Sequence, residues 1–421
     1  MDFGLAAKGV SDPWSFEGGV MSEQAPEQYR GFPVSTVDLR PDRPIFETYR
    51  ELEAISQQGP IVWNTTGEGF WMLNSYDLVK EAFRMDDVFT NRKVNAFDPG
   101  MELRLLPNSL VGQEHKNWRA LINPWFSPGG VRRMESVSRA RCTTLIDELL
   151  PKGSCDFIAE FGILYPTEIF LTFVGLPVED GPKFVAWNEA IFGGFFDVDQ
   201  SAAAAAATAV AKYFEEVVAD RQRSPRDPET DFATYLLQAR IDGEPIAPED
   251  VVTCCSTIML AGLDTTRSAL GFILQHLATH DEDRVRILDP VFADRAVDEF
   301  LRLYSLLIQD GRYIAQDVEF HGCPMKEGEM LSLGIISANR DPAKFEHADE
   351  FFPERGPNPH IAFGLGPHRC PGMHLARLEI AAAIEEWHLR IPNYRLANSD
   401  ELIERGGQLS LRGLPLEWDV A

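Results

Sequence analysis

The chain has 421 residues, of which 44% are hydrophobic, and its formal net charge is -26 at pH 7. This length permits a large core, and the acidity argues against nucleic acid or an anionic membrane surface as a general partner. The six cysteines form no CxxC pair and no zinc spacing, a usage typical of reduced thiols. Residues 1–30 lack the pattern of a secretory signal, and apolar runs such as Ile258–Leu263 are shorter than the ~20 residues of a membrane span. We therefore expect a cytoplasmic protein that binds neither nucleic acid nor a membrane.

Residues 1–40 are rich in glycine, proline, serine and acidic residues, which is typical of a loosely ordered segment. Residues 41–421 contain no repeat and no linker-like break, so we expect one domain. Helical patterns cover residues 46–57, 76–84, 114–122, 130–149, 157–174, 179–192, 200–222, 230–238, 248–280, 291–305 and 371–390. Strand signals cover residues 61–64, 70–73, 313–314, 318–320 and 330–333. The expected fold is mainly α with small β-sheets, and residues 87–112 form a long loop of the kind that is often functional.

The longest predicted helix, residues 248–280, carries an unusual centre. At 1.5 Å per residue it is roughly 50 Å long, enough to cross the domain. Its middle reads AGLDTT over residues 261–266, and Ala261, Asp264, Thr265 and Ser268 share one face by helical spacing. One interpretation is a kink at the glycine, with the threonines bonded back to the preceding turn. The other is a buried acid and hydroxyl that relay protons beside a reactive centre.

A second unusual stretch, FGLGPHRCPG over residues 363–372, precedes the last predicted helix. It places Cys370 at a helix N-terminus beside Arg369 and His368, where the dipole and positive charge favour the thiolate. A thiolate on a rigid turn suits a metal ligand better than a mobile nucleophile. A buried free cysteine after a tight turn is the alternative for an arbitrary cysteine.

The loop over residues 363–372 resembles the FGxGxHxCxG cysteine-ligand loop of the cytochrome P450 haem-thiolate enzymes. Four further segments resemble motifs of that family in the same order, so the resemblance covers residues 45–418: HKNWR at 115–119, AGLDTT at 261–266, EFLR at 299–302 and FPER at 352–355. The resemblance implies the single-domain P450 fold, triangular in outline, with its long central helix over the haem. Asp310-Gly311-Arg312 after the EFLR motif is similar to the soluble bacterial, camphor-hydroxylase-like branch.

By this resemblance the cofactor is haem b, iron protoporphyrin IX, with the Cys370 thiolate on the iron. Residues implied to contact the haem are His115, Arg119, Ala261, Gly262, Arg312, Phe363, Gly364, His368, Cys370 and Gly372. Arg119, Arg312 and His368 would bind the propionates, since buried carboxylates need charged partners. The glycines before Cys370 would leave clearance for the haem plane. Glu299, Arg302 and Arg355 would form a buried structural cluster.

The chemistry implied is insertion of one atom of O2 into a substrate C–H bond, with the other atom leaving as water. Dioxygen would bind beside Ala261 and Gly262. Asp264 and Thr265 would deliver the protons that this reaction consumes. The backbone N–H groups after Cys370 would temper the donation of the sulfur to iron.

Electrons must come from outside, because the chain has no GxGxxG fingerprint after a strand. The family branch implies an acidic [2Fe-2S] ferredoxin with an NAD(P)H-dependent reductase. Docking to an acidic partner needs a local basic patch, for which the candidates are Lys116, Arg119, Arg132, Arg133 and Arg369. The enzyme is expected to be a monomer.

The substrate pocket is expected to be small and apolar. Its candidate lining residues are Phe97, Met101, Leu103, Phe192, Thr257, Leu260, Ile308 and Leu409, with Ile191, Phe195 and Phe196 in the roof. Such a pocket suits a terpenoid or a small aromatic molecule. The tyrosine that binds the ketone in the camphor enzyme aligns with Leu103, which argues against camphor. Arg104 is expected to face solvent, the alternative being contact with an acid group of the substrate.

Two other readings keep the haem and change its use. Peroxide-driven oxidation or C–C coupling would need no ferredoxin, although the Asp264–Thr265 pair argues against the peroxide route. A haem-thiolate gas or redox sensor would leave that pair without a purpose, and no signalling segment is recognisable in the sequence.

Overall fold

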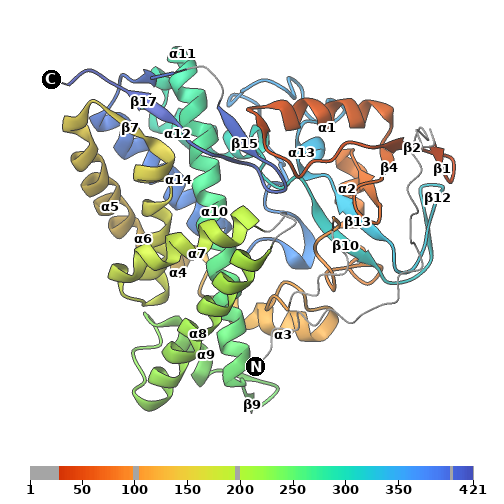
Figure 1. The fold of residues 1–421 in the computed structure, drawn as a ribbon, viewed down its shortest axis with the longest axis horizontal. Coiled ribbons are helices and arrows are strands. Elements are labelled where there is room, and N and C mark those ends of the chain that lie inside the picture. Colours follow the sequence, from red (N-terminus) through yellow and green to blue (C-terminus); the bar gives the residue numbers. More distant parts are fainter. Residues whose placement is uncertain (1–27, 98–103, 195–199, 399–401, 421) are drawn as a thin grey trace.

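The computed structural model describes residues 28–97, 104–194, 200–398 and 402–420 (Figure 1). Of the segment predicted to be loosely ordered, residues 1–27 lie outside the described part. Residues 28–40 differ from that prediction, because Gln28–Tyr29 (β1) and Phe32–Ser35 (β2) pair with each other and β2 joins the main sheet. The regular structure therefore begins earlier than the composition indicated.

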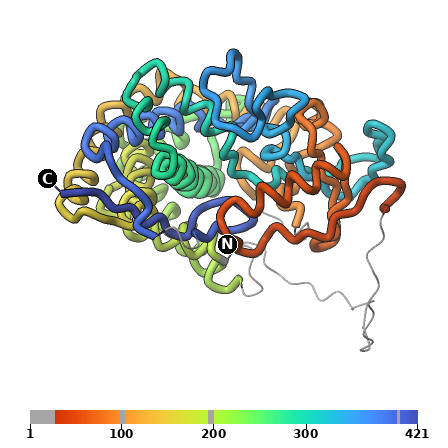
Figure 2. The backbone as a smooth tube through the Cα atoms, turned by 90° about the horizontal axis from the view of Figure 1, so that it is seen from above, coloured from red at the N-terminus to blue at the C-terminus, as the bar shows by residue number. Residues whose placement is uncertain are grey.

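Helix α10, Pro248–Thr279, is the centre of the fold. It runs through the middle of the molecule in Figure 1 and is seen nearly end-on in Figure 2. Pro248 occupies its first turn, where the missing N–H costs nothing. Helices α6 (Leu164–Val174), α8 (Ser201–Arg223) and α14 (Met373–Arg390) pack against it, so its second half from Leu263 onward is buried almost all round.

The remaining helices surround this centre. Their bounds are α1 Glu47–Gln58, α2 Tyr76–Ala82, α3 Gly112–Ile122, α4 Pro128–Val131, α5 Met134–Leu149, α7 Gly181–Gly194, α9 Phe232–Gln238, α11 Asp281–Arg286, α12 Pro290–Leu303 and α13 Ile335–Asn339, with a π-helical turn at Ile158–Gly162 and 3-10 turns at Leu150–Lys152, Val178–Asp180 and Gly366–His368. Among the described helices, none is long and apolar enough to cross a membrane. The short helices α11 and α13 were not predicted, because five or six residues show no clear helical period.

The largest sheet stands beside the helices, on the right in Figure 1. Its strand order is β1-β2-β4-β5-β13-β10-β6, where β4 is Ile61–Asn64, β5 Phe70–Leu73, β6 Phe89–Thr90, β10 Asp310–Ile314 and β13 Met330–Leu333. β4 and β5 form the predicted hairpin, with Ile61 opposite Leu73. The antiparallel pairing of β10 with β13 fixes Arg312 opposite Leu331.

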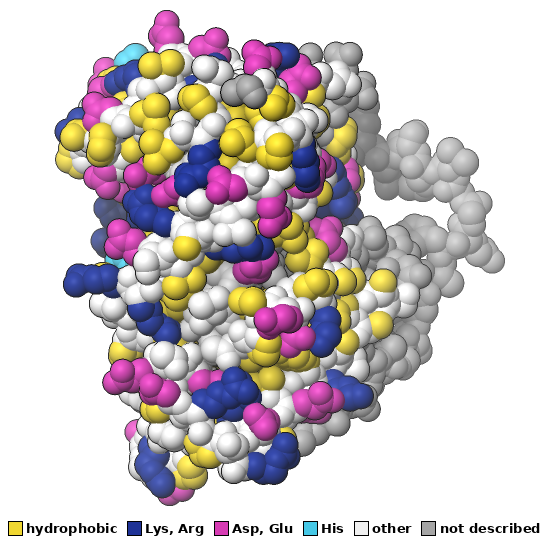
Figure 3. All heavy atoms as spheres, turned by 90° about the vertical axis from the view of Figure 1, so that its left-hand side faces the viewer, with side chains coloured by type: hydrophobic (Ala, Val, Ile, Leu, Met, Phe, Trp, Pro, Cys, Tyr) yellow, Lys and Arg dark blue, Asp and Glu magenta, His cyan; other side chains and the backbone are white. Residues whose placement is uncertain are grey.

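Four small sheets complete the part of the fold that the structure describes. Their strands are β11 Val318–Phe320 with β12 Cys323–Met325, β14 Arg395–Leu396 with β17 Pro415–Glu417 and β7 Ser154–Asp156, β16 Ser410–Leu411 with β15 Ile403–Arg405 and β3 Arg43–Pro44, and β8 Arg240–Ile241 with β9 Glu244–Pro245. The prediction of a mainly α fold with small sheets is confirmed. On the face in Figure 3, Lys and Arg side chains are interspersed with Asp and Glu, so this face carries no block of one charge.

Candidate active site

The cysteine loop is held by the start of α14 and by close backbone packing. Cys370 N donates to Phe363 O at 2.9 Å, which closes the loop on itself. Gly364 and Gly366 have φ values of 66° and 70°, which disfavour any residue with a side chain. A Cβ on Gly366 would lie 2.5 Å from Phe83 O, and one on Gly364 would touch the Phe83 ring. These glycines therefore serve the turn and its contact with Phe83. Clearance for a flat group stays a prediction.

The Cys370 thiol accepts hydrogen bonds from the backbone N–H groups of Gly372 and Met373, the first residues of the α14 N-terminus. Burial nevertheless raises the pKa of this thiol, and the two N–H groups together with Arg119 and Arg369 offset the rise only in part. In the protein without a metal, desolvation therefore opposes the thiolate that the helix dipole and positive charge favour. A bound metal cation would supply the charge that stabilises the thiolate of this partly buried cysteine.

A cluster of cationic and imidazole groups lies near this loop, and we call it the propionate cluster: His115 and Arg119 of α3, Arg312 of β10 and His368. The His115 and His368 rings stack with centroids 3.8 Å apart. Burial and the neighbouring cations lower the pKa of His115 to about 4 and that of His368 to about 2. Three elements distant in sequence thus bring four potential partners for an anion together, as the resemblance implied.

Two nitrogens of this cluster test whether a haem fits. His115 Nε2 and His368 Nδ1 are buried without a hydrogen-bond partner, and such atoms require one in a finished site. Arg312 is held by Asp310 through its Nη2 at 3.1 Å, while Arg119 donates to Asn123 at 3.0 Å. Two carboxylates beside these groups would pair the nitrogens and balance the excess positive charge. The residues present therefore fit a dianionic group such as the two haem propionates.

The centre of α10 has a side with accessible residues, which we call its open side. Ala261 is exposed in the middle of a helix that is otherwise largely buried, and Thr265 is half-buried. Thr265 Oγ1 donates to Ala261 O at 2.9 Å, the back-bonding that the sequence offered as one alternative. Gly262 leaves only ordinary contact distance, 3.7 Å, between a Cβ and the Phe170 ring. The accessible residues on this side of α10 are therefore mostly apolar.

Asp264 faces away from this open side, although helical spacing grouped it with Thr265. Its carboxylate is fully buried. Oδ2 accepts from Arg405 Nη2 and from Gln408 Nε2, the latter at 2.7 Å. On the other oxygen, Asn188 Nδ2 lies 3.5 Å and Arg267 Nη1 3.7 Å from Oδ1. Sequence reasoning missed these partners, because Arg405 and Gln408 come from a C-terminal hairpin more than 140 residues away and no local pattern links them to α10.

Glu299, Arg302 and Arg355 meet in the cluster that the motifs implied. Both oxygens of Glu299 accept three hydrogen bonds each, including a fork from Arg302 at 3.0 and 2.8 Å and one from Arg355 at 2.8 and 2.9 Å. Arg302 also donates to three backbone carbonyls, of Asn339, Ala348 and Glu350. The glutamate and Arg302 are completely buried. This cluster fixes α12 against the segment that leads to the cysteine loop.

The predicted pocket residues fall into three groups. Phe97, Ile308 and Leu409 are buried, and the Phe97 ring packs edge-on against Phe70 at 5.4 Å. Thr257, Leu260 and Phe192 are half-buried on α10 and α7. Met101, Leu103, Phe195 and Phe196 lie outside the described residues. Arg104 is 54% exposed at its side chain and pairs with Asp250 at 2.6 Å, which confirms that it faces solvent.

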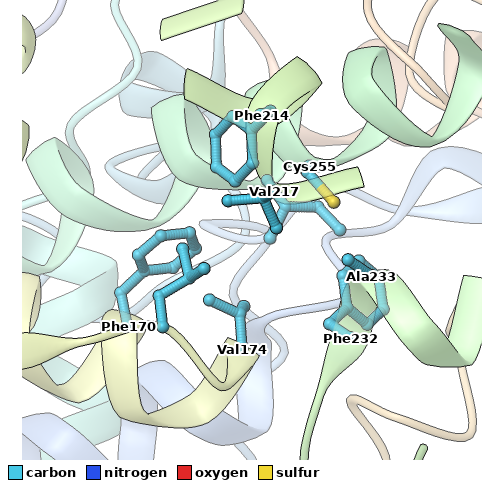
Figure 4. Close-up of a pocket in the computed structure, with 9 residues that line it drawn as sticks. Phe170, Val174, Phe214, Val217, Phe232, Ala233 and Cys255 are labelled. Atoms are coloured by element: carbon cyan, nitrogen blue, oxygen red, sulfur yellow. The ribbon is translucent and has the colours of Figure 1, made fainter. Parts of the chain in front are cut away.

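Figure 4 shows a separate cavity between α6, α8, α9 and α10, lined by Phe170, Val174, Phe214, Phe232 and Cys255 among others. Its volume is about 10 Å³, room for one water-sized sphere, and its lining is almost wholly apolar. It is a gap in the packing and does not hold a substrate.

The basic residues proposed for docking do not share one role. Lys116, Arg132 and Arg369 are exposed. Arg133 instead donates to Phe173 O at 2.9 Å and lies over the Trp125 ring at 4.7 Å, so its role is in packing. Arg119 belongs to the propionate cluster.

The comparisons with known proteins agree with this site. A family model described as Cytochrome P450 matches residues 186–287 and 291–389. The chain is 31% identical to Probable cytochrome P450 127A1 of Sinorhizobium fredii, over 93% of this chain and 95% of that protein. The solved structure of CYP101J2 superposes with a TM-score of 0.84 at 30% identity, covering 94% of this chain and all of that one.

Two further relatives carry names that state a reaction. One is a Methyl-branched lipid omega-hydroxylase of Mycobacterium bovis, 28% identical over 84% of this chain and 85% of the relative. The other is a Steroid C26-monooxygenase of Mycobacterium tuberculosis, 29% identical over 80% of this chain and 90% of the relative. The 31% identity over 93% of the chain agrees with the cysteine loop and with the two buried ring nitrogens that lack partners: the chain belongs to the cytochrome P450 family and is a haem-thiolate monooxygenase.

Proposed function

We propose that this monooxygenase hydroxylates a C–H bond of a small hydrophobic substrate, a terpenoid or small aromatic molecule, using O2 and electrons from an external ferredoxin. The observation that carries this proposal is the exposure of Ala261 at the middle of α10, beside half-buried Leu260 and Thr265, in a helix that is otherwise largely buried. A pocket lined in this way selects its ligand by apolar contact. The two relatives named for a branched lipid and a steroid also act on hydrophobic skeletons, by their names.

The cofactor we propose is haem b, held without a covalent link to the chain. When bound, the haem supplies an iron whose thiolate ligand promotes cleavage of the O–O bond. Cys370 holds the iron, and two backbone N–H groups hold the sulfur in place. His115, Arg119, Arg312 and His368 hold the propionates, which gives the unpaired ring nitrogens their partners.

Protons are the second requirement, because the reaction takes up two electrons and two protons, placing one oxygen atom in the product and the other in water. In our proposal Asp264 and Thr265 carry these protons from the protein side of α10 to the open side. The Thr265 hydroxyl must leave Ala261 O to do so, and the Asp264 carboxylate must exchange one of its present partners or act through a water.

Electrons enter, we propose, from an acidic [2Fe-2S] ferredoxin at the face of Cys370. Arg369 adjoins the ligand, Lys116 precedes Arg119 by one turn of α3, and Arg132 follows α4, which packs on α14. Lys116→Glu and Arg132→Glu should slow reduction and weaken its dependence on salt. Lys212→Glu, the same charge change at an exposed site on α8, is the control; equal rates in all three variants would contradict this docking face.

The substrate class is tested by titrating the haem-loaded enzyme with monoterpenes, small aromatics, steroids and methyl-branched fatty acids, and by following the Soret shift. We expect the strongest shifts from the first two classes. Shifts confined to steroids or fatty acids would overturn that choice.

Thr265→Ala should divert NADH-derived electrons into hydrogen peroxide, and unchanged product per NADH would contradict the proton role. The six free cysteines agree with an enzyme of the reducing cytoplasm.

A further inference from the structure

We propose that Arg405 is a positioning residue for proton delivery: it holds the buried Asp264 carboxylate at the C-terminal hairpin and sets how readily that acid turns toward the open side of α10. This inference rests on the proton role of Asp264 proposed above. Both groups are almost completely buried, with side-chain exposures of 5% for Arg405 and 0% for Asp264. Replacing either partner of an ion pair so removed from water leaves a buried charge uncompensated and is strongly destabilising.

Arg405 differs from the other cation near the acid. Arg267 lies 3.7 Å from Asp264 Oδ1, but it also pairs directly with Glu189, so its charge is shared between two carboxylates. Arg405 donates to Asp264 Oδ2, and its guanidinium carbon lies 5.5 Å from the centre of the Phe192 ring. The full charge of Arg405 therefore acts on the one acid.

The hairpin that carries Arg405 is itself fixed. Glu404, next to it on β15, accepts from Phe46 N and Thr48 N at 2.8 Å each. Gly407 N donates to Leu39 O and Leu409 N to Leu306 O, both at 3.0 Å. Because the hairpin is tied to α1 and to the segment after α12, Arg405 cannot readily follow a moving carboxylate. Motion of Asp264 therefore has to break the contact with Arg405.

The same hairpin also contributes to the predicted pocket. Leu409 is a predicted pocket residue, and Gln408 donates to the same Asp264 oxygen as Arg405. Phe192, whose ring lies by Arg405, is a predicted pocket residue on α7. The pair thus adjoins two residues that are predicted to line the pocket, and this is why we assign it a positioning role in the reaction and not merely a packing role.

The first experiment needs no substrate. Urea unfolding of the haem-loaded enzyme is measured for R405Q, D264N, the double variant and the control R412Q, whose arginine lies on the same part of the chain, is exposed and pairs with Asp42. Each single change at the buried pair should lower the unfolding midpoint, and the double variant should lose clearly less than the sum. Additive losses would overturn the inference, since they would mean that the two groups do not act as a pair.

The second experiment measures product and hydrogen peroxide per NADH, using the panel compound that gives the largest Soret shift. R405Q leaves the buried Asp264 carboxylate without its fixed charged partner, so the acid is no longer held at the place from which it turns toward the open side of α10. Product per NADH should therefore fall about tenfold, the effect of one charge-assisted hydrogen bond, and R405K should restore most of it. R405Q should also shift the pH profile of coupling, which a purely structural loss would not do. Should R405Q fail to retain haem, Gln408→Leu removes the neutral donor to the same oxygen and should give a smaller loss.

The outcomes separate the two proposals. If D264N is uncoupled while R405Q remains as well coupled as R412Q, the positioning role of Arg405 is overturned and the proton role of Asp264 stands. Full coupling in D264N would overturn the proton role of Asp264 and this inference with it. Uncoupling in both variants, with the double variant no worse than D264N, is the result that supports the assignment.

Discussion

The Glu299 cluster and the propionate cluster both gather buried charged groups, but only the first has all its hydrogen bonds, and we call it the finished cluster. Both oxygens of Glu299 accept hydrogen bonds, and Arg302 and Arg355 donate their remaining N–H groups to backbone carbonyls. In the propionate cluster, His115 Nε2 and His368 Nδ1 are buried with no partner, and positive groups face one another. The difference teaches that the first cluster stabilises the fold by itself, whereas the second lacks the partners that an anion would supply, which agrees with the anion receptor we propose.

The largest effect should come from breaking the finished cluster with Glu299→Gln. The amide keeps one acceptor but turns an N–H group toward two guanidinium groups, which leaves buried charge unpaired. We expect a loss of about 3–5 kcal/mol in unfolding free energy, a large part of the stability of a typical domain. Urea unfolding of the haem-loaded enzyme measures it. A variant as stable as the parent would show that the six hydrogen bonds to Glu299 do not hold the fold together.

A smaller effect, and one on the cofactor instead of the fold, should follow Arg119→Leu. This change removes one cation from the receptor while the Glu299 cluster stays intact. Haem should leave about tenfold faster or more, as expected for one lost charge-assisted hydrogen bond. Transfer of haem to excess apomyoglobin measures the rate. Arg139→Leu, at an arginine on α5 that pairs with Glu385, is the control and should leave the rate unchanged.

The third prediction concerns protons taken up by the receptor. Burial and nearby cations lower the pKa of His115 from 6.5 to about 4, and carboxylates placed beside it would raise that pKa again. At a pH above about 4 and below the raised pKa, haem binding should therefore take up a proton at His115. The haem-free protein should lose stability as pH falls from 6.5 toward 4, because His115 binds a proton in the unfolded chain at a higher pH than in the folded protein. Proton uptake near pH 5 to 6 is measured in weakly buffered solution.

His115→Asn is the matched variant for that measurement. It keeps a polar side chain at the same place in α3 and cannot titrate in this range. We expect it to reduce the uptake, and equal uptake in both proteins would assign the protons to another group.

The sequence predicted the finished cluster and the receptor for the same reason. Short motifs in a fixed order name Glu299, Arg302, Arg355, His115, Arg119, Arg312, His368 and Cys370. Regular periodicity placed His115, Arg119, Glu299 and Arg302 on the helices α3 and α12. The sequence did not predict contacts that have no local pattern: Phe83 packs against the loop glycines, and Arg405 and Gln408 donate to Asp264. The net pKa of Cys370 also escaped, because burial is decided by residues that the local motif does not contain.

The smallest effect should come from Asn358→Ala, at the edge of the finished cluster. Asn358 Nδ2 donates to Glu299 Oε2 at 3.1 Å, while its own Oδ1 is buried without a partner. The substitution removes one of six hydrogen bonds to the acid and at the same time removes an unsatisfied carbonyl, so the two terms partly cancel. We expect a loss of about 1 kcal/mol or less in unfolding free energy, by urea unfolding. A loss near that of Glu299→Gln would mean that the cluster fails as a unit when any donor is removed, and the contrast drawn between a self-sufficient cluster and an incomplete receptor would then rest on the receptor alone.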